Sequence, residues 1–527
     1  MKRLLCLVLS LMMVLGATSA LATEYPLVEE KAEFRLIIRM RPLHGDANDM
    51  ELFKRIEELT NIHIDWDQIP QAEYDEKKNL LLAASGSNAA DLPDGFFGKY
   101  SLSSSDIVTY GSQGILIPLN DLIDKYAPNL KALLEKRPEI KGMITAPDGN
   151  IYSTPYVQEG EDGTIASNMM INKTWLERLN LQIPTTMDEL QKVLIAFRDQ
   201  DANGNGDPSD EIPMTFKFNG SQRDIAGLFG AYGYPDTAVD GGNHLIVDNG
   251  KVIYVSVTEG YKLACKELHE KFFSQGLIDM EGFTMDKKTY NAQNQGDIAN
   301  IGVFFCWNSF DLGTKYEHEY VPLAPMLGPN GTTSWPVSPT STMNATGFSI
   351  TNQCENPELL MQWVDTFYDT YWSMQCDLGP VGINLIDNGD GTYSYADVPE
   401  GMSYDEFRSK EAFSSDGPII LLSEFFDTVI GRSEAHQAKY DRNHTYYHPV
   451  AIYQYIPSML MTEEDNDALS MIETDITSYT EEMRAKWLAY GGIDEEWDAY
   501  VERLYRMGLE EYVEIYQRNY TAAYGEK

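Results

Sequence analysis

The first quarter of the sequence alternates strand-like and helix-like segments, which is the pattern of an α/β fold. Residues 34–40 form an apolar, β-rich run, a helical pattern with one apolar face covers 52–59, and apolar and polar residues alternate over 62–66. Strands joined through a helix pair in parallel, so the order predicts a mostly parallel sheet. We expect Asn48 or Asp49 to cap the first helix.

Aromatic and polar side chains follow several of these expected strands. Ligands in parallel sheets bind at the carboxyl ends of the strands. We expect 95–98 to be a loop at one strand end, and the strand at 301–305 to end at Trp307 and Asn308. Flat aromatic rings beside hydrogen-bonding groups suit a carbohydrate or a peptide, whereas the alternative for each ring is packing in the core. The candidate ligand contacts, of which Trp307 is the first choice, are Arg41, Phe96, Phe97, Tyr156, Trp307, Asn308 and Trp335.

The net charge narrows the classes of partner. Acidic residues number 81 against 40 basic ones, a formal net charge of −41. Such a surface repels nucleic acid and anionic membranes and favours cations and uncharged ligands. Because Arg39 and Arg41 are basic, an acidic sugar remains an alternative ligand. A peptide ligand also remains an alternative. The sequence has no Gly-x-Ser-x-Gly, no Gly-x-x-x-x-Gly-Lys and no His-Glu-x-x-His, so no such motif requires an enzyme.

The N-terminus has the pattern of a secretory signal peptide over residues 1–22. Two basic residues precede an apolar run at 4–15, and Ala20-Leu21-Ala22 is a small-x-small cleavage site. We expect cleavage after Ala22 and a secreted, periplasmic or cell-surface protein, the alternative being a buried N-terminal helix. No lipobox cysteine stands at the cleavage site, and no later segment is apolar enough to span a membrane. Four cysteines remain after cleavage, which allows one disulfide without naming the pair.

The run at 199–211 is the sharpest chemical signal in the sequence. It reads Asp-Gln-Asp-Ala-Asn-Gly-Asn-Gly-Asp-Pro-Ser-Asp-Glu, with an oxygen-bearing side chain at every second position from Asp199 to Asp207. Ca²⁺ takes six to eight oxygen ligands, and alternating Asp and Asn residues with two glycines supply them in a short loop. We expect a structural calcium site, and the alternative is a solvated turn without metal.

Several segments, in order, resemble extracellular solute-binding proteins of ABC transporters, most closely the large oligosaccharide-binding group. The resemblance rests on 171–213, on 149–156, on 296–298 leading to Trp307, and on 346–350 before a helix that Asn356-Pro357 begins. It covers nearly the whole chain after the signal peptide. The turn at 379–382 departs from the family pattern, because Val381 replaces a polar residue.

The resemblance implies a two-lobed periplasmic-binding-protein-like α/β fold with discontinuous lobes and a central ligand cleft. Lobe 1 would comprise 24–160 and 340–445, and lobe 2 would comprise 161–339 and 446–527. The protein would be a monomeric, non-enzymatic, substrate-binding component that captures a sugar or oligosaccharide and delivers it to a membrane permease. The alternatives are an extracellular glycan-acting hydrolase or lyase, and a solute sensor with a different docking partner.

The same resemblance implies a calcium loop at the end of a helix. Relative to the family pattern, one extra residue separates the Asn-Gly-Asn-Gly core from the final Asp-Glu. The role of Asp207 as a calcium ligand is therefore in question, and Asp199 is left as a spare ligand. The residues that match the family's calcium ligands are Asp201, Asn203, Asn205, Asp207, Asp210 and Glu211.

Overall fold

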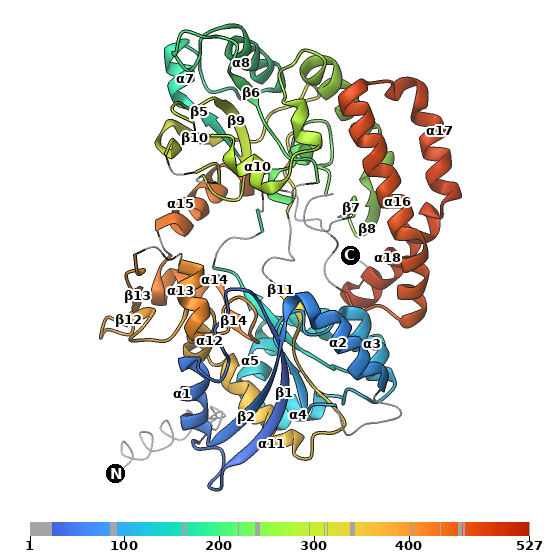
Figure 1. Ribbon diagram of the computed structural model, residues 1–527. Helices are drawn as coiled ribbons and strands as arrows, with labels where there is room; N and C mark the ends of the chain where they lie inside the picture. Colours follow the sequence, from blue (N-terminus) through green and yellow to red (C-terminus); the bar gives the residue numbers. More distant parts are fainter. Residues whose placement is uncertain are drawn as a thin grey trace, which may run out of the picture.

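The chain folds into two α/β lobes, one below the other in Figure 1, each with its own sheet and its own apolar core. The structure is a computed structural model that describes residues 24–84, 92–160, 164–165, 167–219, 221–237, 243–294, 296–309, 311–313, 315–337, 343–400, 402, 404–432, 434–451, 456 and 459–525. The expected signal peptide lies outside the described residues.

The lower lobe is built on a six-stranded sheet of order β14-β4-β11-β3-β1-β2. Neighbouring strands run parallel except β11, which is antiparallel to both β3 and β4. The mostly parallel sheet expected from the sequence is therefore confirmed. The strands are β1 (Ala32–Met40), β2 (Ile62–Pro70), β3 (Gly95–Phe97), β4 (Thr154–Gln158), β11 (Met343–Ile350) and β14 (Ile420–Leu421), with a separate hairpin of β12 (Leu385–Asp387) and β13 (Tyr393–Tyr395).

Two local expectations for this lobe are wrong. The segment expected as a loop at 95–98 contains strand β3, which pairs with β1 and β11 inside the sheet. Met50, without a side-chain cap, stands at the N-cap of α1 in place of Asn48 or Asp49. The helices of the lobe are α1 (Glu51–Thr60), α2 (Gln71–Ala84), α3 (Ser104–Ser112), α4 (Asn120–Tyr126), α5 (Pro128–Lys136), α6 (Pro138–Ile144), α11 (Pro357–Asp365), α12 (Thr370–Leu378), α13 (Tyr404–Glu411) and α14 (Ser423–Phe425).

The upper lobe is built on a four-stranded sheet of order β10-β5-β9-β6. Its strands are β5 (Asn168–Asn172), β6 (Ile212–Met214), β9 (Ile301–Cys306) and β10 (Tyr320–Leu323), and β7 (Leu245–Asp248) pairs with β8 (Lys251–Tyr254) in a separate hairpin. The helices of this part of the chain are α7 (Lys173–Arg178), α8 (Met187–Asp199), α9 (Glu259–Leu268), α10 (Lys287–Ala292), α15 (Glu434–Arg442), α16 (Glu463–Tyr490), α17 (Ile493–Arg506) and α18 (Leu509–Tyr524).

Side chains that cap the helices of both lobes fix where these helices begin. The Asn172 side chain accepts a hydrogen bond from the Trp175 amide, and Asn356 caps α11 through the Leu359 amide. Thr186 caps α8 through the Glu189 amide, and the Glu189 carboxylate accepts from the amide and hydroxyl of Thr185. Such caps satisfy amides that have no partner inside the helix.

The carboxyl edge of the lower sheet is the edge from which the chain passes to the upper lobe. Strands β4 and β14 end there, and the chain continues from them toward β5 and toward α15, which lies between the lobes in Figure 1. On the other side α16 contacts α3 and α18 contacts α6. Residues that follow the lower strands are therefore placed toward the upper lobe.

Two large apolar clusters form the cores, and a smaller third cluster lies around Met170, Tyr290, Phe304 and Tyr320 in the upper lobe. One large cluster gathers buried residues between Phe34 and Val157 and between Ala345 and Ile430, together with Leu460. The other large cluster gathers buried residues between Ile165 and Val337 and between Tyr447 and Tyr520. All four cysteines after the expected cleavage site are free in the structure. In the described ranges no helix combines the length and apolar character that a membrane span requires.

Candidate functional site

Arg41 follows β1 at the carboxyl edge of the lower sheet and is held by a buried acid. Its Nε lies 2.8 Å from Oδ2 of Asp416, and its Nη2 donates to the Ser414 carbonyl at 2.6 Å. Burial raises the pKa of Asp416, and Arg41, Lys99 and Arg39 oppose that rise. Three cations around one carboxylate leave the edge locally positive, in contrast to the acidic chain as a whole.

His44 packs beside Arg41 with a completely buried side chain. Its Nδ1 lies 3.2 Å from the Arg41 backbone N–H and its Nε2 lies 3.2 Å from Arg41 Nε. Burial, and then the charge of Arg41, lower the pKa of His44 to about 4. The imidazole is therefore neutral at neutral pH and has one acceptor nitrogen: Nδ1 accepts from the Arg41 amide, while a protonated Nε2 faces the Ser414 carbonyl at 3.4 Å.

The next strand end carries a lysine between two tyrosine rings. Lys99 Nζ lies 4.3 Å from the centre of the Tyr156 ring and 4.9 Å from that of Tyr100, and the Arg39 guanidinium lies 5.7 Å from the Tyr100 ring. Lys99 and Tyr156 are buried, whereas Tyr100 is 48% exposed. This arrangement presents one aromatic face with cations beside it.

In the upper lobe Trp307 follows β9 and is half-buried over a second cation. The Lys439 ammonium lies 2.8 Å from the centre of its indole ring. Its backbone amide donates to Asp311, whose carboxylate also pairs with Arg223 at 2.8 Å, and its carbonyl accepts from Arg442 at 3.3 Å. Aromatic rings with adjoining cations therefore follow a strand in each lobe.

The remaining sequence-predicted contacts are less accessible. Phe96 and Phe97 have no exposed surface, because β3 is an inner strand with core on both sides. Trp335 is 1% exposed, and its Nε1 donates to the Ser167 carbonyl inside the upper core. None of these three rings offers a ligand an accessible face. Asn308 is 9% exposed and follows Trp307 directly.

The loop at 199–211 closes around the Asp201 and Asp210 carboxylates. The two oxygens of Asp201 accept from the amides of Gly204 and Gly206 at 2.8 and 3.0 Å. Both glycines have positive φ, 81° and 91°, a conformation that glycine adopts without strain. The side chains of Asn203 and Asn205 donate to the two oxygens of Asp210 at 2.8 and 2.7 Å.

Glu211 completes this loop and fits a positively charged group. Its Oε1 accepts from the Asn203 amide at 3.2 Å, while its Oε2 is buried and has no hydrogen-bond partner among the residues that the structure describes. Burial raises the pKa of Glu211, and the neighbouring charge of Asp210 raises it further. Asp207 accepts from the amide and hydroxyl of Ser209, and Asp199 pairs with Arg198 at 2.7 Å. The described residues contain no group of three or more His, Cys, Asp or Glu side chains arranged around one point for a metal.

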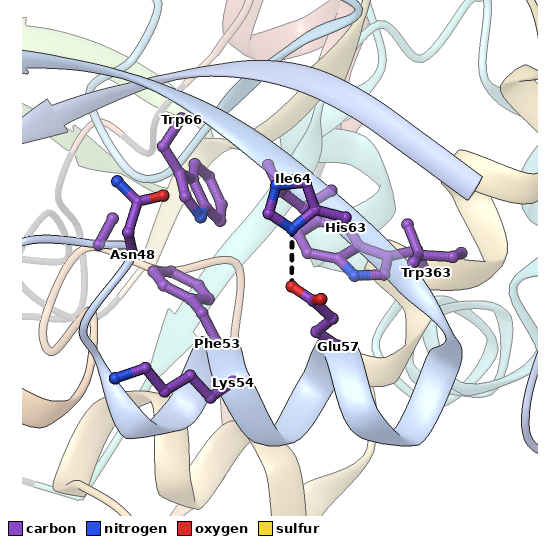
Figure 2. Close-up of a pocket in the computed structure, with 10 residues that line it drawn as sticks. Asn48, Phe53, Lys54, Glu57, His63, Ile64, Trp66 and Trp363 are labelled. Atoms are coloured by element: carbon purple, nitrogen blue, oxygen red, sulfur yellow. Dashed lines mark hydrogen bonds and ion pairs between the residues drawn. The ribbon is translucent and has the colours of Figure 1, made fainter. Parts of the chain in front are cut away.

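A small cavity lies between α1 and β2 of the lower lobe (Figure 2). Phe53, Trp66 and Trp363 wall it, and Glu57 accepts from His63 at 2.7 Å beside it. Its volume is about 80 Å³, below the roughly 300–1,000 Å³ typical of small-molecule sites. The cavity therefore suits ordered water next to the buried indole N–H of Trp363, which has no hydrogen-bond partner within the described ranges.

A larger, open hollow of about 480 Å³ lies where β2 ends against α2. Leu80, Leu81 and Ala84 supply an apolar wall, and Asp67 and Gln68 follow the strand. Unlike the small cavity, this hollow is at the carboxyl edge of the sheet and is large enough for a small ligand.

Sequence reasoning missed Lys99, Tyr100 and Lys439. Lys99 and Tyr100 come directly after Phe97-Gly98. A correct assignment of the strand would therefore have made these two residues the candidate contacts at the strand end. No local pattern signals Lys439, because it reaches Trp307 only through the path of the chain between the lobes.

Comparisons with known proteins agree with this architecture. The family model "Bacterial extracellular solute-binding protein" matches residues 43–370. Over 518 residues the chain is 34% identical to the fructooligosaccharide ABC transporter substrate-binding protein FusA of Streptococcus pneumoniae serotype 4, covering 94% of this chain and 91% of FusA.

Solved structures give the same result. FusA in complex with kestose superposes with a TM-score of 0.79 at 32% identity, covering 94% of this chain and all of that one, and a FusA EF-hand mutant in complex with fructo-nystose gives 0.78. An HMO-binding, ABC-transporter-associated solute-binding protein of Bifidobacterium longum infantis gives 0.81 at 25% identity, covering 94% of this chain and all of that one. The chain therefore belongs to the family of bacterial extracellular solute-binding proteins.

Proposed function

We propose that this protein is the substrate-binding component of an ABC transporter that captures an oligosaccharide. The observation that carries the proposal is the similarity to FusA, which runs through both lobes and 94% of the chain. FusA is a substrate-binding protein and binds kestose, so the role is binding rather than catalysis. We propose a fructose-containing or other neutral oligosaccharide as the ligand.

The proposed ligand contacts lie at the strand ends that approach the region between the lobes. Trp307 offers an indole face, and Asn308 and Arg41 offer hydrogen-bond donors to sugar hydroxyls. Closure of the two lobes around the sugar would be a hinge motion, after which the monomeric protein docks on its permease. The two large core clusters support lobe limits near 24–160 with 340–445 and 161–339 with 446–527, with two exceptions. Leu460 belongs to the lower core, and Lys439 and Arg442 of α15 contact the upper lobe.

The proposed location is outside the cytoplasmic membrane. The family is extracellular, and residues 1–22 have the pattern of a signal peptide with cleavage after Ala22. Since no lipobox cysteine follows the apolar run, we propose a protein released into the periplasm or the medium or held at the surface by another means.

We also propose that the loop at 199–211 holds a structural Ca²⁺. The Oε2 of Glu211, buried and unpaired within the described part of the chain, and the carboxylate and amide oxygens of Asp201, Asn203 and Asn205 suit a hard cation. The similarity to a protein studied as an EF-hand mutant supports the same assignment. When bound, the ion would neutralise acidic side chains that otherwise repel one another.

A calcium titration tests the metal assignment. Added Ca²⁺ should raise the melting temperature of the chelator-treated protein, and Glu211→Gln should abolish that increase. Asp199→Asn is the matched control, because Asp199 pairs with Arg198, and it should respond like the wild type. An unchanged melting temperature in chelator and in Ca²⁺, with no metal by elemental analysis, would refute the assignment.

A thermal-shift screen tests the transport role. The mature protein is heated with kestose, nystose, other neutral oligosaccharides, uronate oligosaccharides and peptides. A solute that binds only the folded state raises the melting temperature by mass action. We expect neutral oligosaccharides to raise it, whereas a response to peptides alone would refute the proposed ligand class.

A further inference from the structure

The turn after β3 holds a tyrosine in an unfavourable backbone conformation. Tyr100 has a φ of 64°, in the left-handed region that bulky residues rarely adopt. The turn is fixed by hydrogen bonds from the Gly98 amide to Gly347, from the Lys99 amide to Asp416 and from the Tyr100 amide to the Thr346 hydroxyl. A glycine at this position would adopt the same backbone without strain.

The side chain of Tyr100 adds a second unfavourable feature. Its ring is 48% exposed, so much of its apolar surface stays in water. Neither the strain nor the exposure stabilises the fold. Strained backbone that the surrounding structure holds in place is typical of functional sites.

The cations beside the ring explain how it is oriented. Arg39 and Lys99 both lie within cation–π distance of Tyr100, and Lys99 is only 8% exposed and also contacts the Tyr156 ring. The tyrosine ring is thus held in position before any ligand arrives, which lowers the entropy lost on binding.

We propose that Tyr100 is a sugar-stacking residue of the lower lobe, with Lys99 and Arg39 as its positioning residues. The inference rests on the proposed function and extends it. The ligand is a sugar ring whose C–H face covers the tyrosine while its hydroxyls accept from the Arg39 guanidinium. Tyr100 was not among the sequence-predicted contacts, and its accessible ring replaces the buried rings of Phe96 and Phe97 in the lower lobe.

Two substitutions separate binding from folding. Tyr100→Gly removes the ring and relieves the backbone, and Tyr100→Asn removes the ring with a residue that tolerates the left-handed region. Tyr100→Phe keeps the ring. Tyr505→Ala is the matched control, since Tyr505 is 54% exposed on α17. Each variant is titrated calorimetrically with kestose or with the oligosaccharide that gives the largest thermal shift.

We expect Kd to rise about tenfold or more in the Gly and Asn variants and to stay within about twofold of wild type in Tyr100→Phe and Tyr505→Ala. The melting temperature of Tyr100→Gly without ligand should not fall. A merely structural role for the ring would instead require the melting temperature to fall. Wild-type affinity in both ring-less variants would overturn the inference and leave the proposed function intact. A wild-type protein that binds no oligosaccharide would overturn the proposed function and the inference with it.

Discussion

Protonation of His44 should destabilise the protein as the pH falls. The buried ring faces two N–H donors of Arg41, the Ser414 carbonyl at 3.4 Å and the Asp416 carboxylate at 3.8 Å. Its pKa is lowered from 6.5 to about 4, first by burial and then by Arg41. Between these values the unfolded chain binds a proton that the folded chain does not. The free energy of unfolding therefore falls as the pH drops from 6.5 to 4.

The size of the effect follows from the displacement of the pKa. At about 1.4 kcal/mol per tenfold change in an equilibrium constant, the loss at pH 4 is about 3 kcal/mol. His44→Asn removes the titrating ring, and its Oδ1 can still accept from the Arg41 backbone. The variant should lose about 3 kcal/mol less than wild type between pH 7 and pH 4.

Urea unfolding followed by circular dichroism at several pH values measures this difference. His318→Asn, on the half-exposed 3-10 turn at Glu317–Glu319, is the matched control and should follow the wild-type pH dependence. Every acid is retained in both variants, so the titration of the acids that do not contact His44 cancels in the comparison. If the free energy of unfolding of wild type and of His44→Asn changed in parallel from pH 6.5 to pH 4, His44 would not be the group whose protonation destabilises the protein.

Three further predictions concern packing, buried charge and binding. Phe97→Ala should lower the free energy of unfolding in urea by about 3–5 kcal/mol, and a loss below about 1 kcal/mol would contradict its core position. Asp224→Ala should cost about 3–5 kcal/mol in the same assay, because the completely buried Arg484 is left with the Asp236 carboxylate at 3.7 Å after losing its nearer carboxylate at 3.0 Å, and because the amides of Asn219 and Ala226 lose their acceptor; a neutral effect would show that Asp224 is dispensable. Trp307→Ala should raise Kd for the bound oligosaccharide about tenfold in calorimetry with little change in melting temperature, whereas unchanged Kd would remove Trp307 from the site.

The parts of the fold that local sequence signals determine were predictable. Asn172, Thr186 and Asn356 cap helices through their own side chains, and the cap needs only the residues two or three positions away. The parallel pairing of β1 with β2 follows from the helix between them. These features require no knowledge of distant contacts.

Burial at strand ends could not be predicted in the same way. Phe96 and Phe97 are inaccessible because distant segments enclose them: β11, more than 240 residues later in the chain, pairs with β3, and Trp363, Phe367 and Phe413 pack around the Phe97 ring. Trp335 is buried for a related reason, since Tyr447 packs against its ring at 5.1 Å. Tyr100 is exposed in a turn after β3 in which it adopts a left-handed conformation, and the sequence signals neither feature.

A solute-binding protein of this kind binds an oligosaccharide and releases it unchanged. Isothermal titration of the mature protein with kestose and nystose, followed by chromatography of the sugar recovered after prolonged incubation, tests this behaviour directly. We expect saturable binding of one sugar per chain and quantitative recovery of intact oligosaccharide. Cleaved sugar would contradict it in favour of a glycan-acting enzyme, and the absence of heat with every oligosaccharide would contradict the proposed ligand class.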